Sequence, residues 1–310
     1  MVNLAPVLIT TLNRSIHFKR CVESLSLCTH ADKTVLYIAL DYPLHDSHKA
    51  GYKIIKKYLP SIKGFKSVII IERDRNFGAV DNFFDLIDQV FKKYDRVIIS
   101  EDDNVFSIDF LAFVNKGLEV YEKRSDIFSI SGYQYPIKVP KAYKDDVYIW
   151  TGFSAWGVGI WKEKWNKVDW EYPELKIFLD DKRNIKKIKS ISENYVAALK
   201  SILKTGYITG DTLISYHLIV HGLFSIFPIV SRVRNMGHDG SGVHCGYLEK
   251  DIYSAQVLNL KNNDTNFPIN IEKSSKMYKS LKSHFRYSLW VKTKRRIKNI
   301  LSYATIMKSK

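Results

Sequence analysis

The fold is decided by the stretch Val97-Ile98-Ile99-Ser100-Glu101-Asp102-Asp103-Asn104, in which a short apolar strand runs directly into three adjacent carboxylates. Neighbouring carboxylates repel one another, so a cation is expected among them. At the carboxyl end of a strand in a doubly wound α/β sheet, such oxygen ligands suit a divalent metal that faces a phosphorylated substrate. The alternative is helix capping, because acids near a helix start suit its dipole. Capping needs only one group, however, and Ser107 supplies it for a helix expected over residues 109–121.

Strand-like and helix-like segments alternate through the first half of the chain, with short links between them. Near-continuous apolar strands separated by amphipathic helices indicate a parallel sheet that is covered on both faces. The sequence therefore predicts an α/β fold. The expected strands are residues 5–11, 33–40, 66–71 and 96–100, and the expected helices are residues 15–27, 45–58, 80–91 and 108–121.

Polar residues follow each expected strand, at the edge where open α/β sheets bind ligands. Arginine there suits phosphate oxygens, and an aspartate at a strand end can accept hydrogen bonds from a base or a ribose. Each residue alone is more simply explained as a capping or turn residue, whereas the ensemble favours one binding crevice. The set comprises Thr11, Asn13 and Arg14 at the first strand, Asp41 after the second, Arg73, Arg75 and Asn76 after the third, and the acidic triplet after the fourth.

The sequence lacks two common phosphate-binding signatures. No G-x-G-x-x-G follows the first strand, and no Gly-Lys-Thr or Gly-Lys-Ser loop occurs. Dinucleotide oxidoreductases and P-loop enzymes are therefore disfavoured. A metal that bridges a diphosphate fits the crevice better than a glycine cradle.

The net charge of +16 belongs mostly to the carboxyl end of the chain. Residues 273–310 contain twelve Lys or Arg and no Asp or Glu, so +4 remains for the rest, and a nucleic-acid partner is not expected. Tyr278, Leu281, Phe285 and Leu289 follow a helical spacing with basic residues beside them, which is typical of a helix on anionic lipid, where each basic residue contributes about 1 kcal/mol. A solvated charged helix explains the pattern equally well. Residues 251–310 are thus predicted to be a basic helical extension of a domain that spans residues 1–250.

Cysteine usage and hydropathy indicate the cellular compartment in which this chain is expected. Cys21, Cys28 and Cys245 give neither a disulfide framework nor a zinc spacing, which indicates a reducing cytoplasm. No apolar run approaches the ~18 to 20 residues needed to span a bilayer, and residues 2–12 are expected to form the first strand rather than a signal peptide.

The second half is rich in aromatic residues and glycine. Five of the six tryptophans lie between Trp150 and Trp170, and flat rings suit the C–H faces of sugars as well as core packing. Trp161 and Trp165, one helical turn apart, are expected in the core. At most one or two rings of this block are expected to contact a ligand, with Trp156 as the named candidate. After a Lys-rich helical region over residues 180–204, Asp211 is placed as a helix cap. Residues 232–244 are expected to form a mobile lid.

Taken together, these segments resemble a nucleotide-sugar glycosyltransferase of the GT-A fold. The triplet Glu101-Asp102-Asp103, followed by Phe106, Asp109 and Phe110, is similar to the Glu-Asp-Asp metal motif of the N-acetylglucosaminyltransferase I-like branch, and bacterial family 2-like glycosyltransferases are similar as well. The resemblance covers roughly residues 5–250 and includes Asn13-Arg14-Ser15, Asp41, residues 153–165, Asp211 and Gly242-Val243-His244. It implies a Rossmann-like mixed, mainly parallel sheet flanked by helices, with a donor half of about residues 1–130 and an acceptor half of about residues 131–250.

Carried over residue by residue, the resemblance implies that Asp103 ligates Mn²⁺ or Mg²⁺ and that Asp102 and Glu101 contact the ribose and the donor sugar. Asp211 would be the general base, and a base opposite the leaving group implies inversion at the anomeric carbon. His238 or His244 could add a metal ligand, although a phosphate-contacting or solvent-facing histidine is the favoured interpretation. The donor-binding residues implied are Thr11, Asn13, Arg14, Asp41, Arg75, Asn76, Trp156 and His244.

The acceptor does not transfer with the resemblance, because the Lys-rich region before Asp211 departs from the family. A basic end and no expected membrane anchor suggest a bacterial enzyme that works peripherally at the inner membrane face. It is expected to move a hexosyl or N-acetylhexosaminyl group from a UDP-sugar to a lipid-linked saccharide, for surface polysaccharide. Two alternatives remain open. A sugar-1-phosphate nucleotidyltransferase would need a glycine-rich basic loop after the first strand, and a non-enzymatic polyanion or membrane-surface binding module leaves the acidic triplet unexplained.

Overall fold

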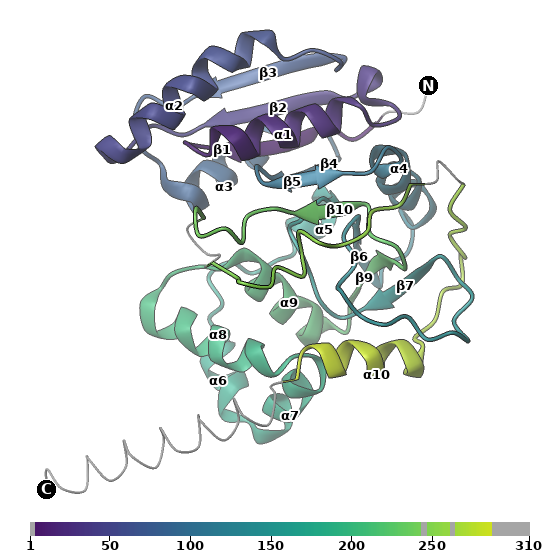
Figure 1. Cartoon of the computed structure of the whole chain (residues 1–310). Helices are drawn as coiled ribbons and strands as arrows, with labels where there is room; N and C mark the ends of the chain where they lie inside the picture. Colours follow the sequence, from purple (N-terminus) through teal and green to yellow (C-terminus); the bar gives the residue numbers. More distant parts are fainter. Residues whose placement is uncertain (1–3, 243–246, 261–263, 287–310) are drawn as a thin grey trace, which may run out of the picture.

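The computed structural model describes residues 4–242, 247–260 and 264–286. Within these ranges, eight strands form one large sheet with helices against it, and two short strands form a second sheet (Figure 1). The large sheet combines parallel and antiparallel pairs. This confirms the expected α/β class and the expected mixed, mainly parallel sheet.

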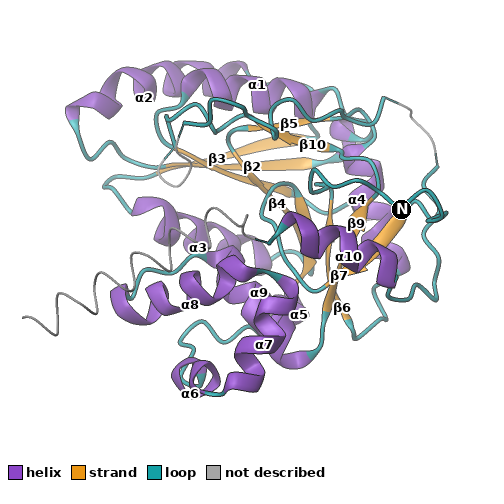
Figure 2. Ribbon diagram, turned by 60° about the horizontal axis from the view of Figure 1, so that its bottom comes forward, coloured by secondary structure: helices purple, strands orange, loops and turns teal. Residues whose placement is uncertain are grey.

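The first four strands form the parallel part of the sheet, and helices cover both of its faces (Figure 2). Along the first strand Val7 and Ile9 point to the core under one helical layer, whereas Leu8 points to the core under the other. Burial on both faces explains why these consecutive residues of the strand are all apolar. In the order β3-β2-β1-β4, the bounds are β1 Val7–Thr11, β2 Val35–Leu40, β3 Ser67–Glu72 and β4 Arg96–Glu101; the helices are α1 Ser15–Ser26, α2 Asp46–Tyr58 and α3 Gly78–Phe91, with short 3₁₀ turns at Ala31–Lys33 and Leu59–Ser61.

The sheet continues beyond β4 with strands of alternating direction. β8 runs antiparallel to both β4 and β6, β9 runs parallel to β6, and β7 closes the edge antiparallel to β9. The small sheet pairs β5 with β10 directly after the acidic triplet. The bounds are β5 Asn104–Phe106, α4 Phe110–Val120, β6 Ile127–Ser131, β7 Val147–Trp150, β8 Val158–Trp161, α5 Lys162–Trp165, β9 Phe224–Pro228 and β10 Val233–Asn235.

A layer of helices packs near the β7 edge and encloses a separate apolar core. This core contains Trp150 of β7 together with Leu175, Leu199 and Met277 from three different helices. The layer consists of α6 Leu175–Asp180, α7 Lys182–Ile191, α8 Glu193–Thr205, α9 Gly210–His221 and α10 Ser275–His284 (Figure 1).

The stripe predicted to face lipid instead faces the protein in its described part. Leu281 is fully buried, the ring of Phe285 is nearly parallel to that of Trp150 at 6.2 Å between centroids, and Tyr278 meets Trp150 edge-on at 4.7 Å. The apolar stripe of α10 is therefore buried against the protein, Leu289 lies outside the described residues, and membrane contact of the chain stays a prediction. No helix in the described ranges has the length and apolarity required to cross a bilayer.

Residues after 250 also contribute to the main core. The ring of Phe267 lies 5.0 Å from that of Phe113 and is buried, and the Tyr121 hydroxyl donates a hydrogen bond to the Pro268 carbonyl at 2.9 Å. The chain around these residues is thereby fastened to α4, behind the acidic triplet.

Candidate active site

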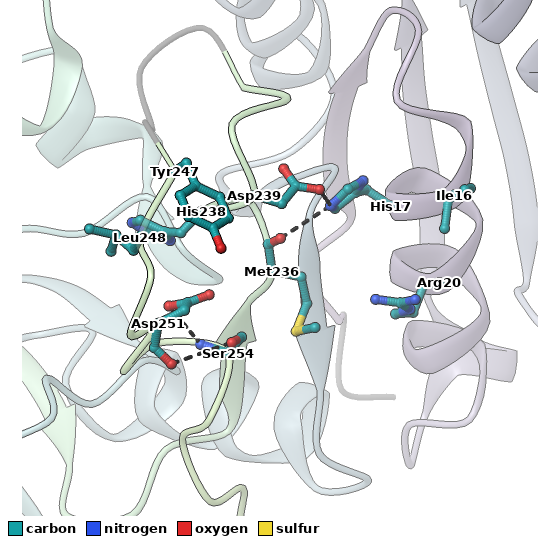
Figure 3. Close-up of a pocket in the computed structure, with 10 residues that line it drawn as sticks. All are labelled: Ile16, His17, Arg20, Met236, His238, Asp239, Tyr247, Leu248, Asp251 and Ser254. Carbon is teal, nitrogen blue, oxygen red and sulfur yellow. Dashed lines mark hydrogen bonds and ion pairs between the residues drawn. The ribbon is translucent and has the colours of Figure 1, made fainter.

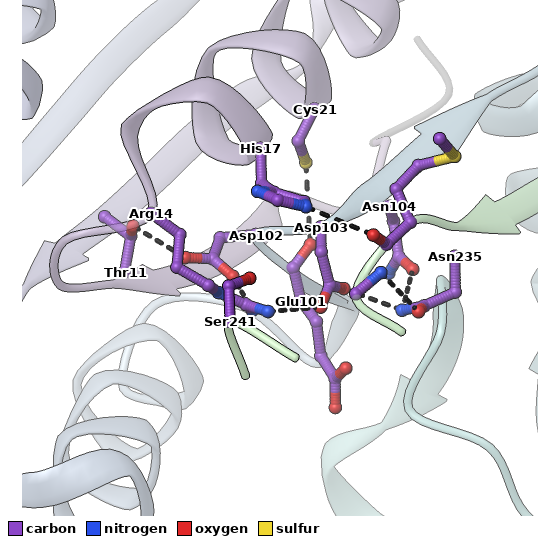
Figure 4. Close-up of polar contacts among 12 residues, drawn as sticks. Thr11, Arg14, His17, Cys21, Glu101, Asp102, Asp103, Asn104, Asn235 and Ser241 are labelled. Atoms are coloured by element: carbon purple, nitrogen blue, oxygen red, sulfur yellow. Dashed lines mark hydrogen bonds and ion pairs between the residues drawn. The ribbon is translucent and has the colours of Figure 1, made fainter. Parts of the chain in front are cut away.

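The carboxylates of Asp102 and Asp103 lie where the parallel strands β1 and β4 end side by side (Figure 4). The Thr11 hydroxyl donates to Asp102 at 2.8 Å. The guanidinium of Arg14, just before α1, donates to Asp102 and, at 2.7 Å, to Asp103. Burial alone would lower the pKa of Arg14, but the two carboxylates outweigh it and raise that pKa. The strand ends therefore bring Thr11 and Arg14 into contact with the acids, and a ligand-binding crevice at this place stays a prediction.

The far side of Asp103 is covered by the end of β10. The Asn235 amide donates to Asp103 Oδ1 at 2.7 Å, and the backbone N–H of Met236 donates to the Asp103 carbonyl at 2.9 Å. A Cβ atom at Gly237 would lie 2.1 Å from Asp103 Oδ2, so only glycine fits there. The segment expected to be a lid thus begins in direct contact with the acidic corner.

Glu101 binds a different partner from its two neighbours. Its carboxylate accepts a hydrogen bond from the indole N–H of Trp156 at 3.0 Å. Burial raises the pKa of Glu101 well above its usual range, and the charges of Asp103 and Asp211 raise it further. The Trp156 ring meets the ring of Tyr133 edge-on at 4.8 Å. Trp156 therefore lies at the site, as the sequence predicts, with a defined contact to the triplet.

Asp211 lies in the first turn of α9, but its carboxylate does not cap that helix. Thr209 occupies the cap position, and Asp211 Oδ2 instead accepts from the backbone N–H of Ala155 at 3.2 Å. Burial raises the pKa of Asp211 to about 6, against the smaller opposite effect of the Ala155 N–H. Adjacent residues 155 and 156 thus hold the Asp211 and Glu101 carboxylates, so that Asp211 lies at the same site as the triplet.

The candidates beyond β2 and β3 have mainly structural contacts. The Asp41 carboxylate accepts from the backbone N–H groups of Phe77 at 2.8 Å and Gly78 at 2.9 Å, which fastens the start of α3 to the end of β2. The Asn76 amide also lies within hydrogen-bonding distance of Asp41, at 3.3 Å. The guanidinium of the exposed Arg75 lies over the Phe77 ring, 5.2 Å from its centroid. Nucleotide contacts for Asp41, Arg75 and Asn76 stay predictions.

The last two donor-binding candidates are Asn13 and His244. The Asn13 carbonyl accepts from the Ser15 N–H at 3.0 Å and touches α2, where a Cβ atom at Gly51 would lie 1.8 Å from the Asn13 oxygen. His244 lies outside the described residues.

Sequence reasoning missed a pocket of about 350 Å³ between α1 and residues 236–239 and 247–254 (Figure 3). His17 Nε2 lies 3.1 Å from the Met236 carbonyl oxygen and 3.2 Å from an Asp239 carboxylate oxygen. The His238 ring stacks on Tyr253, with 4.4 Å between centroids. The three-residue spacing of Arg14, His17 and Arg20 was the available signal, because it places them on one side of α1.

Asn235 was missed as well, although its partner Asp103 was predicted. β10 has three residues, too few for a periodic pattern, and Asn235 reaches the site only because it pairs with Asn104 of β5.

A divalent metal fits the chemistry of the corner, although the corner is arranged around Arg14. Carboxylate oxygens are preferred ligands of Mg²⁺ and Mn²⁺, and Asp102 and Asp103 present them together. Both oxygens of Asp103 already have partners, Asn235 and Arg14. Among the residues that the structure describes, no group of three or more His, Cys, Asp or Glu is arranged to hold a metal.

Comparison with known proteins gives a likeness at the level of structure. No family model and no curated protein matches the sequence. The mannosyltransferase PcManGT from Pyrobaculum calidifontis, in complex with GDP-Man and Mn²⁺, is 13% identical with a TM-score of 0.35, over 51% of this chain and 44% of that one. S. aureus TarS is 10% identical with a TM-score of 0.35, over 50% and 28%. GalNAc-T7 with UDP, GalNAc and Mn²⁺ is 12% identical with a TM-score of 0.44, over 75% and 44%.

The chain spans less than half of the length of each of these three proteins. At such identities the likeness concerns the fold. The chemistry of this chain is therefore argued from its own residues.

Proposed function

We propose that this chain is a metal-dependent glycosyltransferase that moves a sugar from a nucleotide donor to a hydroxyl of a saccharide. The observation that carries the proposal is the meeting of two kinds of carboxylate at one site. Asp102 and Asp103 form a cation-binding corner, and Asp211, held by the Ala155 N–H, is a separate carboxyl group whose pKa is raised to about 6. Diphosphate departure needs the first, and activation of an attacking hydroxyl needs the second.

Asp211 is proposed as the general base. With a pKa near 6 it is mostly ionised at pH 7, yet it is more basic than an exposed aspartate, which suits proton removal from a hydroxyl. A positioned base of this kind typically contributes ~10²- to 10⁴-fold to the rate. Placed opposite the leaving group, it would invert the anomeric centre.

The donor is proposed to lie along the triplet. A divalent ion held by Asp103, with Asp102 beside it, would supply neutralisation of the departing diphosphate. The Arg14 guanidinium suits phosphate oxygens, and the pair Glu101 and Trp156 would contact the donor sugar. The remaining parts of the proposal rest on sequence grounds alone. The nucleotide is proposed to be UDP, the acceptor to be a lipid-linked saccharide for bacterial surface polysaccharide, and the enzyme to lie peripherally at the inner membrane face.

The test is thermal unfolding with UDP, UDP-sugars and GDP-mannose, each with and without Mn²⁺. A ligand present at 100 times its dissociation constant stabilises by about 2.7 kcal/mol, which is readily measured. Asp103→Asn should lose the metal-dependent part of this stabilisation, whereas the matched change Asp32→Asn, at an exposed aspartate, should keep it. Absence of any nucleotide effect in the wild type, or an undiminished effect in Asp103→Asn, would contradict the proposal.

The role of Trp156 is tested by Trp156→Phe, which keeps an aromatic ring but removes the N–H that binds Glu101. Leaving a buried acceptor without its hydrogen-bond donor costs about 1–3 kcal/mol, or roughly 5- to 150-fold in turnover if the bond acts in the transition state. Trp161→Phe is the matched control, because the buried N–H of Trp161 has no hydrogen-bond partner among the described residues. Equal transfer rates of the two variants would exclude the proposed contact.

A further inference from the structure

Arg14 occupies the place in the acidic corner where a cation belongs. Its guanidinium contacts Asp102 through one nitrogen and Asp103 through the other, at 2.7 Å from Asp103 Oδ2. Only 7% of the Asp102 side chain and 3% of the Asp103 side chain are exposed, against 19% of the Arg14 side chain. Buried carboxylates are stable only when they are paired, and Arg14 provides that pairing without any metal.

We propose that Arg14 is a built-in competitor of the divalent metal, which binds Asp103 once the guanidinium has left. This inference rests on the proposed function. A guanidinium and a dication on the same carboxylate oxygen would repel each other strongly at this burial, so their occupancies exclude one another. Arg14 and the metal are alternative partners of one site.

The backbone that covers Asp103 lies against Arg14 as well. A Cβ atom at Gly237 would lie 3.2 Å from Arg14 Nη1 as well as 2.1 Å from Asp103 Oδ2, so the backbone there rests on the ion pair. The next contact is His17, one turn along α1 from Arg14, whose Nε2 lies 3.1 Å from the Met236 carbonyl oxygen. Departure of Arg14 therefore loosens the start of the segment that follows β10.

The diphosphate of a donor gives the displaced guanidinium a new partner. Arginine binds phosphate oxygens in the same forked geometry that it uses here with two carboxylates. Metal binding and diphosphate binding are thus coupled through Arg14: the metal frees the guanidinium, and the diphosphate holds it away from Asp103. Metal alone binds weakly, and metal with nucleoside diphosphate binds tightly.

Titration with Mn²⁺, followed by the electron paramagnetic resonance of the free ion, tests the competition without any transfer reaction. In the absence of nucleotide, Arg14→Gln should bind Mn²⁺ at least 10-fold more tightly than the wild type. Arg14→Lys, which keeps the charge, should not show this gain. Arg20→Gln removes an exposed charge two turns along α1 and should leave the affinity within 2-fold. An Mn²⁺ affinity of Arg14→Gln equal to or below that of the wild type overturns the inference.

The coupling gives a second measurement that needs only the wild type. UDP should tighten Mn²⁺ binding at least 10-fold in the wild type and less than 3-fold in Arg14→Gln. Should Arg14→Gln not fold, equal Mn²⁺ affinities of the wild type with and without UDP still overturn the inference. The two failures are separable, because competition for Mn²⁺ without sugar transfer would refute the function alone, and transfer without competition would refute this inference alone.

Discussion

Replacing Asp211 by asparagine should remove sugar transfer and at the same time stabilise the fold at neutral pH. The carboxyl group is held by one backbone N–H, from Ala155, and burial raises its pKa from 3.8 to about 6. A raised pKa means that the folded protein holds the proton more tightly than the unfolded chain. Ionisation of Asp211 therefore opposes folding, and an amide of the same shape avoids that cost.

The size and the pH window follow from the two pKa values. Below pH 3.8 both states are protonated and Asp211 has no effect on stability, whereas between 3.8 and 6 the unfolded state loses its proton first and stability falls as pH rises. The gain for Asp211→Asn should thus be about 1 kcal/mol at pH 4.5 and about 3 kcal/mol, as an upper value, at pH 8. At about 2 °C per kcal/mol, the latter raises Tm by roughly 6 °C.

Denaturant unfolding at pH 4.5 and pH 8 measures this difference in the free energy of unfolding. Asp126→Asn is the control, for which a stability change of the opposite sign is expected. The Asp126 carboxylate accepts two hydrogen bonds from Arg124, at 2.7 and 2.8 Å, which lower its pKa, so its loss should destabilise at pH 8 and have little effect at low pH. The reasoning about Asp211 is refuted if Asp211→Asn is destabilised at pH 8, or if its gain is the same at both pH values. A stability gain with undiminished transfer would refute the catalytic assignment alone.

Two other substitutions test the lid and the last helix. Gly237→Ala places a methyl group 2.1 Å from Asp103 Oδ2, so it should lower the free energy of unfolding by about 1–3 kcal/mol and weaken Mn²⁺ binding. Gly210→Ala is the control, because its methyl group meets no atom of the described residues within 4 Å and should have neither effect. Calorimetry with and without Mn²⁺ compares the two variants. Leu281→Ala should cost about 2–5 kcal/mol in a denaturant titration because Leu281 is fully buried, and the exposed Lys282→Ala should stay within about 0.5 kcal/mol; equal losses would show that α10 does not belong to the core.

The parallel half of the fold could be predicted because its signals are local. The strand expected over residues 96–100 spans Arg96–Glu101, and the helix expected over residues 45–58 spans Asp46–Tyr58. The helical region expected over residues 180–204 is two helices, since Ser192 is extended and its hydroxyl accepts from the Asn194 N–H at 3.3 Å to start α8. A serine at a helix start is a recognised signal, so this boundary was readable.

The contacts that complete the site could not be predicted, because they join distant parts of the chain. An amphipathic stripe indicates that α10 has an apolar face, but the same stripe suits lipid and protein, and only the packing of Phe285 on Trp150 decides between them. Likewise, the acid motif indicates a cation at Asp103, but it does not specify that the cation in this structure is the side chain of Arg14.

The segment between Gly152 and Trp156 links the two ends of the proposed chemistry. The Ala155 N–H holds Asp211 and the Trp156 indole holds Glu101, so the separation between the base and the donor-side carboxylate depends on two adjacent residues. The Trp156 ring also meets His238 edge-on at 5.7 Å, one residue after Gly237, whose backbone covers Asp103. Movement of the backbone at Gly237 would therefore reach Trp156 and, through it, the alignment of Glu101 with Asp211. It follows that displacement of Arg14 should affect Asp211 as well as the metal site, although Arg14 contacts only Asp102 and Asp103 of the metal site.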